Sequence, residues 1–204
     1  MAATYPTPAA AVETETEVKK SRFIARATKV CSREEAFAVV ARARHDFPDA
    51  RHHCWAYLLG NPQSAVNAAM SDDGEPGGTA GRPILNVIQH KGVGDLIVVV
   101  TRYFGGIKLG AGGLVRAYSG AAEAAMSILP LENTRVMQRA TLTMDFSREQ
   151  PLRHWLGQHQ GEVQSVDYGV RVVMRVSVPQ EQVDEMTAYC AAARAVDIKI
   201  EQVQ

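Results

Sequence analysis

The stretch from Thr101 to Tyr118, TRYFGGIKLGAGGLVRAY, has the residue types of an anion site. Five glycines fall within nine residues, and an alanine-rich run with helical spacing follows them and stops before Pro130. A glycine loop that leads into a helix leaves backbone N–H groups free, and the helix dipole adds partial positive charge there. We therefore expect phosphate at this loop. The expected contacts are Gly105, Gly106, Lys108, Gly110, Gly112, Gly113 and Arg116, with Arg82, Arg102 and Tyr103 adding charge or stacking.

The known phosphate motifs do not fit this loop. Gly105 to Gly110 has P-loop spacing, but Ala111 and Gly112 stand where that motif needs Lys and Ser or Thr. The dinucleotide pattern fails because Val115 stands where Gly or Ala is required. Two interpretations remain open: a backbone site for phosphate, or a glycine loop that only lets the helix pack closely on a sheet.

A second irregular stretch, residues 71–83 (SDDGEPGGTAGRP), carries the carboxylates Asp72, Asp73 and Glu75 among four glycines and two prolines. It is too polar for a core and too rich in glycine for a helix, so it predicts a shaped loop. Such a loop can hold a divalent cation, supply a catalytic acid and base, or form a turn in which the Asp side chains bind their own backbone. We expect it to share one concave surface with the glycine loop.

The elements around these loops follow from hydrophobic patterning. Asp95 to Phe104 predicts a strand buried on both faces, because it is β-branched and aromatic without a helical period. Ser32 with Glu35 predicts a capping box at the start of a helix, and Thr79 is expected to cap the helix that contains Pro83. Two strands are expected in Val12 to Val30 and another in Arg51 to Gly60. The small residues and prolines of the N-terminus suggest a loosely ordered lead-in.

A domain boundary is predicted at Pro130 to Arg135, which breaks the helical pattern. Beyond it the order is strand, helix, strand, strand, helix, strand, which is the split βαβ order of a ferredoxin-like domain. The sequence thus predicts an α+β protein with domains at 1–132 and 136–204, each with a sheet covered by helices on one face.

Composition narrows the class of protein. The chain of 204 residues has 22 basic and 22 acidic side chains, so its formal net charge is zero, unlike that of a dedicated duplex-DNA binder. Cys31, Cys54 and Cys190 lack the spacing of a disulfide framework or a zinc site, and His52, His53 and Cys54 in a row cannot converge on one ion from a strand. The N-terminal residues lack the basic start and apolar core of a signal peptide, and no apolar run approaches the length of a membrane span. We therefore expect a cytoplasmic protein without membrane contact.

The chain resembles the IMPACT/YigZ family in four segments. These are SDDGEPGGTAGRPIL (71–85), VVVTRYFGGIKLGAGGLVRAY (98–118), KKSRFIA (19–25) and DARHHCWAY (49–57). The resemblance implies an N-terminal domain similar to the second domain of a small-subunit ribosomal protein, a β-α-β fold. It also implies a C-terminal domain similar to the ferredoxin-like domains of translocation factor G.

The resemblance also implies a role in translation, because eukaryotic IMPACT proteins regulate it. They do so through an RWD domain, and no such domain is visible in this sequence. We therefore expect a non-enzymatic protein that binds RNA or the ribosome, without a cofactor. The alternatives are an enzyme on a small phosphorylated metabolite, with a metal at the acidic loop, and an adaptor that binds another protein. Oligomeric state and metal binding do not follow from the sequence.

Overall fold

The computed structural model describes residues 4–63, 67–193 and 196–201. They form two compact units: one spans Tyr5–Thr134, and the other begins at Arg135 and also includes Thr4. Each unit combines helices with a β-sheet, so the two-domain α+β fold predicted from the sequence is confirmed. Within the described residues, no helix is both long and apolar enough to cross a membrane.

The first unit is built on a five-stranded antiparallel sheet with the order β2-β3-β6-β4-β5. A separate two-stranded sheet pairs the first strand, β1, with the last strand of the unit, β7. The elements are β1 Thr4–Pro8, β2 Val12–Val18, β3 Ser21–Lys29, α1 Arg33–Asp46, β4 His52–Leu59, β5 Asn67–Ser71, α2 Gly81–Lys91, β6 Leu96–Tyr103, α3 Ala111–Ile128 and β7 Leu131–Arg135.

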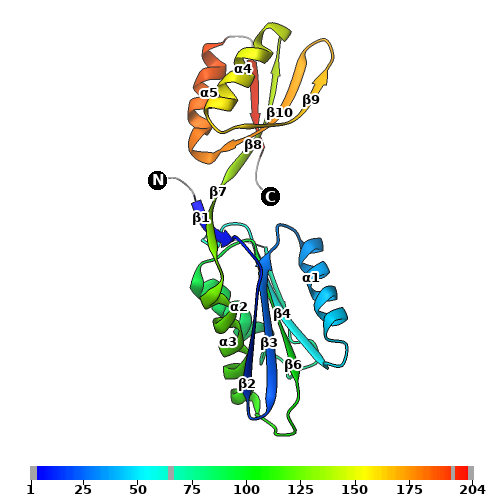
Figure 1. The fold of residues 1–204 in the computed structure, drawn as a ribbon. Coiled ribbons are helices and arrows are strands. Elements are labelled where there is room, and N and C mark those ends of the chain that lie inside the picture. Colours follow the sequence, from blue (N-terminus) through cyan, green and yellow to red (C-terminus); the bar gives the residue numbers. More distant parts are fainter. Residues whose placement is uncertain (1–3, 64–66, 194–195, 202–204) are drawn as a thin grey trace. The chain divides into compact units, whose positions relative to one another are not determined.

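Helices cover both faces of this sheet, so the prediction of helices on one face is wrong for the first unit. Figure 1 shows α1 on one side of the sheet and α2 with α3 on the other. The central strand β6 explains this arrangement, because its side chains alternate between two cores. Val98 and Val100 pack in the core under α2 and α3, whereas Ile97 and Val99 pack in the core under α1. The prediction that β6 is buried on both faces is confirmed.

Helix α1 begins as the capping box predicted. The hydroxyl of Ser32 accepts a hydrogen bond from the Glu35 backbone N–H at 3.1 Å, and the Glu35 carboxylate accepts one from the Cys31 N–H at 2.7 Å. Two N–H groups at the helix start are therefore satisfied by side chains.

The prediction of a loosely ordered N-terminus is wrong from Thr4 onward, because side-chain hydrogen bonds fix β1 to other parts of the chain. The Tyr5 hydroxyl donates to the Asp95 carboxylate at 2.7 Å, and the hydroxyls of Thr7 and Thr134 lie 2.7 Å apart. Strands β5 and β7 were likewise not predicted. They are short, and β7 is polar along most of its length, so neither has a clear apolar alternation.

The second unit has the predicted ferredoxin-like order. Its four-stranded antiparallel sheet runs β11-β8-β10-β9, and one core lies between the sheet and its two α-helices. The elements are β8 Met137–Met144, α4 Phe146–Gln158, β9 Glu162–Tyr168, β10 Val172–Pro179, the 3₁₀ turn Gln180–Gln182, α5 Val183–Ala192 and β11 Val196–Ile200.

Candidate functional site: an uncapped helix start beside a braced acidic loop

The first turn of α3 has no anionic partner within the part of the chain that the structure describes. Its N-cap residue is Gly110, which makes no side-chain cap, and the turn contains no acidic residue. The first main-chain bond of the helix runs from the Leu114 N–H to the Gly110 carbonyl at 2.9 Å. The N–H groups before Leu114 therefore remain available at the positive end of an 18-residue helix.

Three cations of the predicted site are exposed and near this helix start in sequence or in the fold. They are Arg82 at the start of α2, Lys108 in the glycine loop and Arg116 on α3. Within the described residues, none of the three forms an ion pair or a side-chain hydrogen bond. A guanidinium nitrogen of Arg116 lies 3.6 Å from the position that a Cβ on Gly112 would take. Positive charge therefore stands beside the free amides.

The structural constraint that favours glycine differs among the five glycines of the loop. A Cβ on Gly105 would overlap the backbone of Lys20, and one on Gly113 would press on the Leu109 side chain at 3.0 Å. Gly106 and Gly110 have φ values of +84° and +72°, which other residues rarely adopt. Gly112 has neither constraint, because its φ is ordinary and a Cβ added there would have only the Arg116 guanidinium within 4 Å. Packing and turn geometry thus explain four of the glycines but not Gly112.

Asp72 caps the other helix start of this region. Its carboxylate accepts hydrogen bonds from the backbone N–H groups of Gly78, Ala80 and Gly81, at 2.8 to 2.9 Å. The predicted cap, Thr79, instead donates its hydroxyl to the Pro76 carbonyl, so that prediction is wrong. Burial alone would raise the pKa of Asp72, but the three N–H donors outweigh it and lower the pKa below its usual value. The N–H groups at the start of α2 are therefore already capped by a carboxylate of the same chain.

Asp73 and Glu75 point to different partners. Asp73 accepts from Arg44 at 2.6 Å and from the backbone N–H of His53 at 2.7 Å. Glu75 accepts from Arg102 at 2.6 Å and from the Tyr118 hydroxyl at 2.7 Å, and its side chain is only 4% exposed. No group of three or more His, Cys, Asp or Glu side chains in the described residues is arranged to hold a metal ion. The metal-site alternative for the acidic loop has no support in this geometry.

Arg102 does not reach the surface as a phosphate ligand would need to. Its side chain is 7% exposed and forms the buried ion pair with Glu75, while its guanidinium lies between the rings of Phe23 and Phe104, 5.6 Å from each centroid. This geometry does not support a direct contact between Arg102 and a ligand. Tyr103 is partly buried, with the Arg22 guanidinium 5.4 Å from its ring centroid. The exposed aromatic side chain beside this loop is Phe104, which is 58% exposed.

The Glu75 carboxylate joins the two irregular loops. Glu75 comes from the acidic loop, Arg102 ends the strand before the glycine loop, and Tyr118 lies on the helix after it. Burial, together with neighbouring Cys54 and Glu75, raises the pKa of Tyr118, so its hydroxyl stays a donor. Burial likewise raises the pKa of the Cys54 thiol to about 12, and that thiol donates to the Asp72 carbonyl at 3.0 Å. These contacts fix the acidic loop against α3.

A groove between α2 and α3 was not predicted. It has a volume of about 380 Å³ and begins at Gly78. Its walls come from two parallel rows of side chains on the two helices. They are Arg82, Pro83, Asn86, Val87 and His90 on α2, and Val115, Ser119 and Glu123 on α3. The signal available in the sequence was the four-residue spacing along each helix, which by itself did not show that the two rows face each other.

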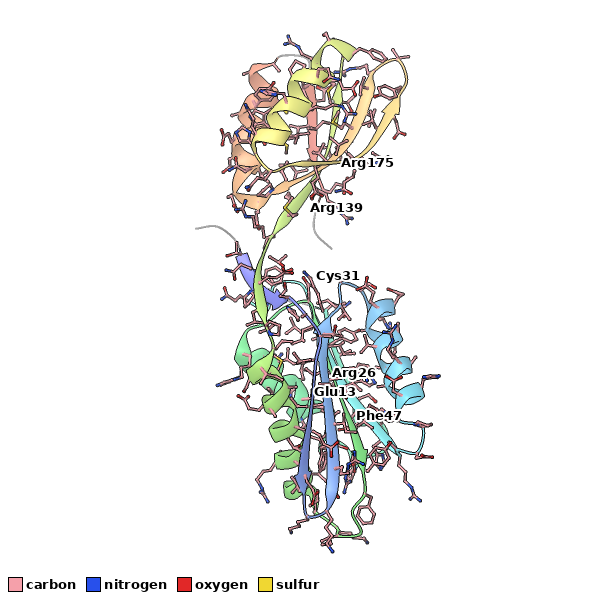
Figure 2. The ribbon with its side chains drawn as sticks, viewed as in Figure 1. Glu13, Arg26, Cys31, Phe47, Arg139 and Arg175 are labelled. Carbon is pink, nitrogen blue, oxygen red and sulfur yellow. The ribbon has the colours of Figure 1, made fainter. Side chains whose placement is uncertain are left out.

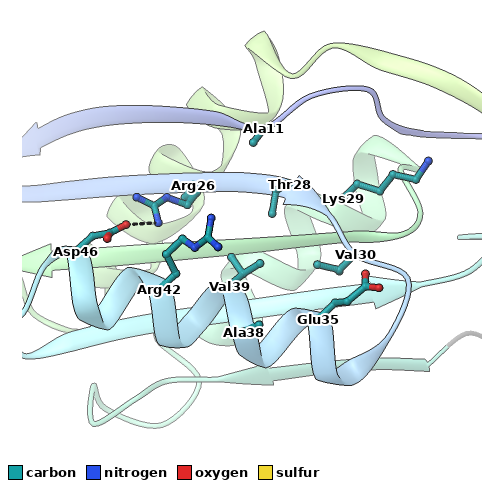
Figure 3. Close-up of a pocket in the computed structure, with 10 residues that line it drawn as sticks. All are labelled: Ala11, Arg26, Thr28, Lys29, Val30, Glu35, Ala38, Val39, Arg42 and Asp46. Carbon is teal, nitrogen blue, oxygen red and sulfur yellow. Dashed lines mark hydrogen bonds and ion pairs between the residues drawn. The ribbon is translucent and has the colours of Figure 1, made fainter.

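A second pocket of about 500 Å³ lies beside α1 and is drawn in Figure 3. Arg26 and Asp46 form an ion pair across it at 2.8 Å. Arg26 also pairs with Glu13 at 2.7 Å, and its guanidinium lies 5.7 Å from the centroid of the Phe47 ring; Figure 2 labels these three residues. This pocket includes none of the predicted site residues.

Comparison with known proteins supports the resemblance found in the motifs. The Impact N-terminal domain matches residues 19–126, and a domain of unknown function, DUF1949, matches residues 142–188. IMPACT family member YigZ of Escherichia coli (strain K12) is 41% identical over 184 residues, which cover 90% of this chain and 90% of that protein.

Two further similarities extend this comparison. A protein IMPACT homolog of Dictyostelium discoideum is 31% identical over 126 residues, which cover 61% of this chain and 35% of that protein. A crystal structure of a hypothetical protein is 37% identical with a TM-score of 0.81, and the match covers 100% of this chain and 98% of the other. The family predicted from the motifs is confirmed: the chain belongs to the IMPACT family.

Proposed function

We propose that this protein binds RNA, on or near the ribosome, and takes part in the regulation of translation. The contact is made by RNA phosphates at the start of α3. The protein works by binding and needs no cofactor for it.

The observation that carries the proposal is the contrast between two helix starts in one region. The start of α2 is closed by the Asp72 carboxylate, which accepts three backbone N–H groups. The start of α3 has no such partner in the described residues, although a helix of that length has equivalent free N–H groups. A phosphate of a ligand would accept hydrogen bonds from the N–H groups at the start of α3, as the Asp72 carboxylate does at the start of α2.

The surrounding charges fit a small number of phosphates. Lys108, Arg116 and Arg82 are exposed cations without an ion pair in the described residues. The chain as a whole has no net charge, so it would not attract nucleic acid over a wide surface. A local contact of a few phosphates is compatible with a neutral protein, whereas a long duplex footprint is not.

Exposed Phe104 adds a feature that suits single-stranded RNA. Its side chain is 58% exposed and lies between the end of β6 and the glycine loop. Unstacked bases stack on aromatic side chains, and this contact does not depend on the base. Support for translation as the process comes from the resemblance of both domains to folds of the translation apparatus and of the chain to eukaryotic IMPACT proteins.

A small phosphorylated metabolite would use the same amides. It is the weaker candidate, because Asp72, Asp73 and Glu75 are each engaged by the protein itself and do not converge. Among the described residues, the loop therefore offers neither a set of converging metal ligands nor a free general base for such an enzyme.

Sedimentation of a cell lysate tests the proposed function. We expect the full-length protein to migrate with ribosomal particles on a sucrose gradient and to move to the top after ribonuclease treatment. A Lys108→Ala, Arg116→Ala variant should stay at the top in both cases. Migration at the top of the gradient by the wild type without ribonuclease would contradict a role at the ribosome.

A further inference from the structure

We propose that the groove between α2 and α3 is a nucleoside subsite, which takes the base and ribose of one RNA nucleotide whose phosphate lies at the start of α3. The inference rests on the proposed function and names the part of RNA, beyond phosphate, that the same region recognises.

The groove is continuous with the phosphate site. Val115 lines it and lies one helical turn from Ala111, the first residue of α3. One turn advances about 5.4 Å along the axis. Arg82 lines the groove from the opposite helix at its first turn. A ligand with its phosphate at the start of α3 would thus extend directly between the two helices.

The size and walls of the groove suit one nucleoside. Its volume of about 380 Å³ is in the range of small-molecule sites. Pro83, Val87 and Val115 supply apolar surface, while Asn86 and Ser119 add hydrogen-bonding groups between them. Flat apolar surface with a few polar groups is what a nucleobase and its sugar require.

Three planar polar side chains follow one wall at four-residue spacing. Arg82, Asn86 and His90 lie along one side of α2 over a length of about 12 Å. All three are exposed, and within the described residues none forms a hydrogen bond or an ion pair. Guanidinium and imidazole planes stack on bases, and an amide can pair with base edges. The groups that recognise bases in other proteins are therefore present here without an intramolecular partner.

The helices that form the groove are fixed in place. Lys91 of α2 and Glu123 of α3 form an ion pair at 2.5 Å near the far end of the groove. The near end is held by Glu75, which bonds Tyr118 of α3. The walls need no large rearrangement to receive a ligand, so little affinity is lost to ordering.

Fluorescence anisotropy with two labelled oligomers tests the subsite. One is single-stranded RNA of mixed sequence, and the other is an abasic ribose-phosphate oligomer of the same length, which keeps every phosphate. If one base occupies the groove, the wild-type protein should bind the RNA roughly fivefold or more tightly than the abasic oligomer. Asn86→Trp, which fills the groove, should lower RNA affinity toward the abasic level, leaving only the share that stacking on Phe104 supplies, and should leave abasic binding unchanged.

The matched control is Gln89→Trp, which changes an exposed amide on the same helix outside the groove. It should bind both oligomers as the wild type does. His90→Ala provides a second variant that adds no bulk, and it should reduce RNA binding without changing abasic binding. Thermal melting of each variant shows that the fold is intact.

The outcomes separate this inference from the proposed function. Equal wild-type affinity for RNA and abasic oligomer, or equal effects of Asn86→Trp and Gln89→Trp, would overturn the subsite while phosphate binding stood. Failure of the wild type to bind either oligomer at low salt would overturn both.

Discussion

The Glu75 carboxylate accepts a hydrogen bond from Arg102 at 2.6 Å, although the two residues are 27 positions apart and their side chains are only 4% and 7% exposed. The same carboxylate oxygen accepts the Tyr118 hydroxyl at 2.7 Å. One buried group therefore holds the acidic loop, the end of β6 and helix α3 together.

Removal of Glu75 should strongly destabilise the protein. Glu75→Ala leaves the Arg102 charge buried without its partner, so we expect a loss of about 3–5 kcal/mol in the free energy of unfolding. Urea titration followed by circular dichroism measures it. Glu132→Ala removes the partner of Lys29 from an ion pair whose side chains are 52% and 37% exposed, and should cost at most about 1 kcal/mol. A Glu75→Ala loss no larger than that of Glu132→Ala would contradict the buried pair.

Asp72 should make stability depend on acidic pH. Its carboxylate accepts three backbone N–H groups, which lower its pKa in the folded state despite burial. A depressed folded pKa stabilises the protein above the unfolded pKa of about 4, and this contribution is lost as the pH falls through the lower folded value. Urea unfolding between pH 7 and pH 2.5 should show a decline in the wild type that is smaller in Asp72→Asn. The same pH profile in both proteins would rule out this role of Asp72.

Substitution by alanine should have different effects on protein stability at two glycines of the same loop. Gly105→Ala should destabilise the fold, because its Cβ would overlap the backbone of Lys20. Gly112→Ala meets only the Arg116 side chain and lies in a helix, where alanine is favoured over glycine by at most about 1 kcal/mol. The melting temperature of Gly112→Ala should therefore be equal to or above that of the wild type.

RNA affinity should nevertheless fall in Gly112→Ala, since its Cβ enters the space in front of the α3 amides. Gly120→Ala, at an open position farther along the same helix, is the control and should bind as the wild type does. Anisotropy with a mixed-sequence RNA compares them. Identical affinities for the two variants would show that Gly112 has no role in binding.

The three thiols should differ in reactivity. Cys31 is exposed, whereas Cys54 and Cys190 are buried, and burial raises the pKa of Cys54 to about 12. A thiol-specific reagent at pH 8 should modify one cysteine in the folded protein and all three in guanidinium chloride, because only the exposed thiol can reach the reagent. Mass spectrometry after digestion identifies the site. Modification of Cys54 before unfolding would contradict its placement under the acidic loop.

Local patterns were enough to predict much of the fold. The alternation and turn residues beyond Pro130 gave the ferredoxin-like order, and the β-branched run of β6 indicated burial on both faces. Such features depend on neighbouring residues only. Strand β1 has two prolines in five residues, and Thr7 forms a hydrogen bond with Thr134, 127 positions away. The pairing of β1 with β7 therefore could not be predicted from a local pattern. The placement of α1 opposite α2 and α3 was equally hidden, since an apolar face does not say which side of a sheet it covers.

The site was predicted as a region and not as a set of contacts. The glycine spacing correctly located the helix start, but the same composition could not show that Gly105 is required by Lys20 and Gly112 by nothing within the protein. The acidic residues looked alike in sequence, yet Asp72 caps a helix and Glu75 neutralises Arg102. Their roles depend on partners brought near by the tertiary fold.

The central claim, that RNA phosphates bind at the start of α3, is tested most directly by the affinity of a mixed-sequence single-stranded RNA at several salt concentrations. Fluorescence anisotropy should give a slope of log affinity against log salt of roughly −1.4 to −2.8 for the wild type, as expected for about two to four phosphates. Lys108→Ala with Arg116→Ala should weaken binding to all RNA sequences alike and make the slope shallower, because phosphate contacts carry no base information. Wild-type affinity no better than that of the double variant at low salt would contradict the claim.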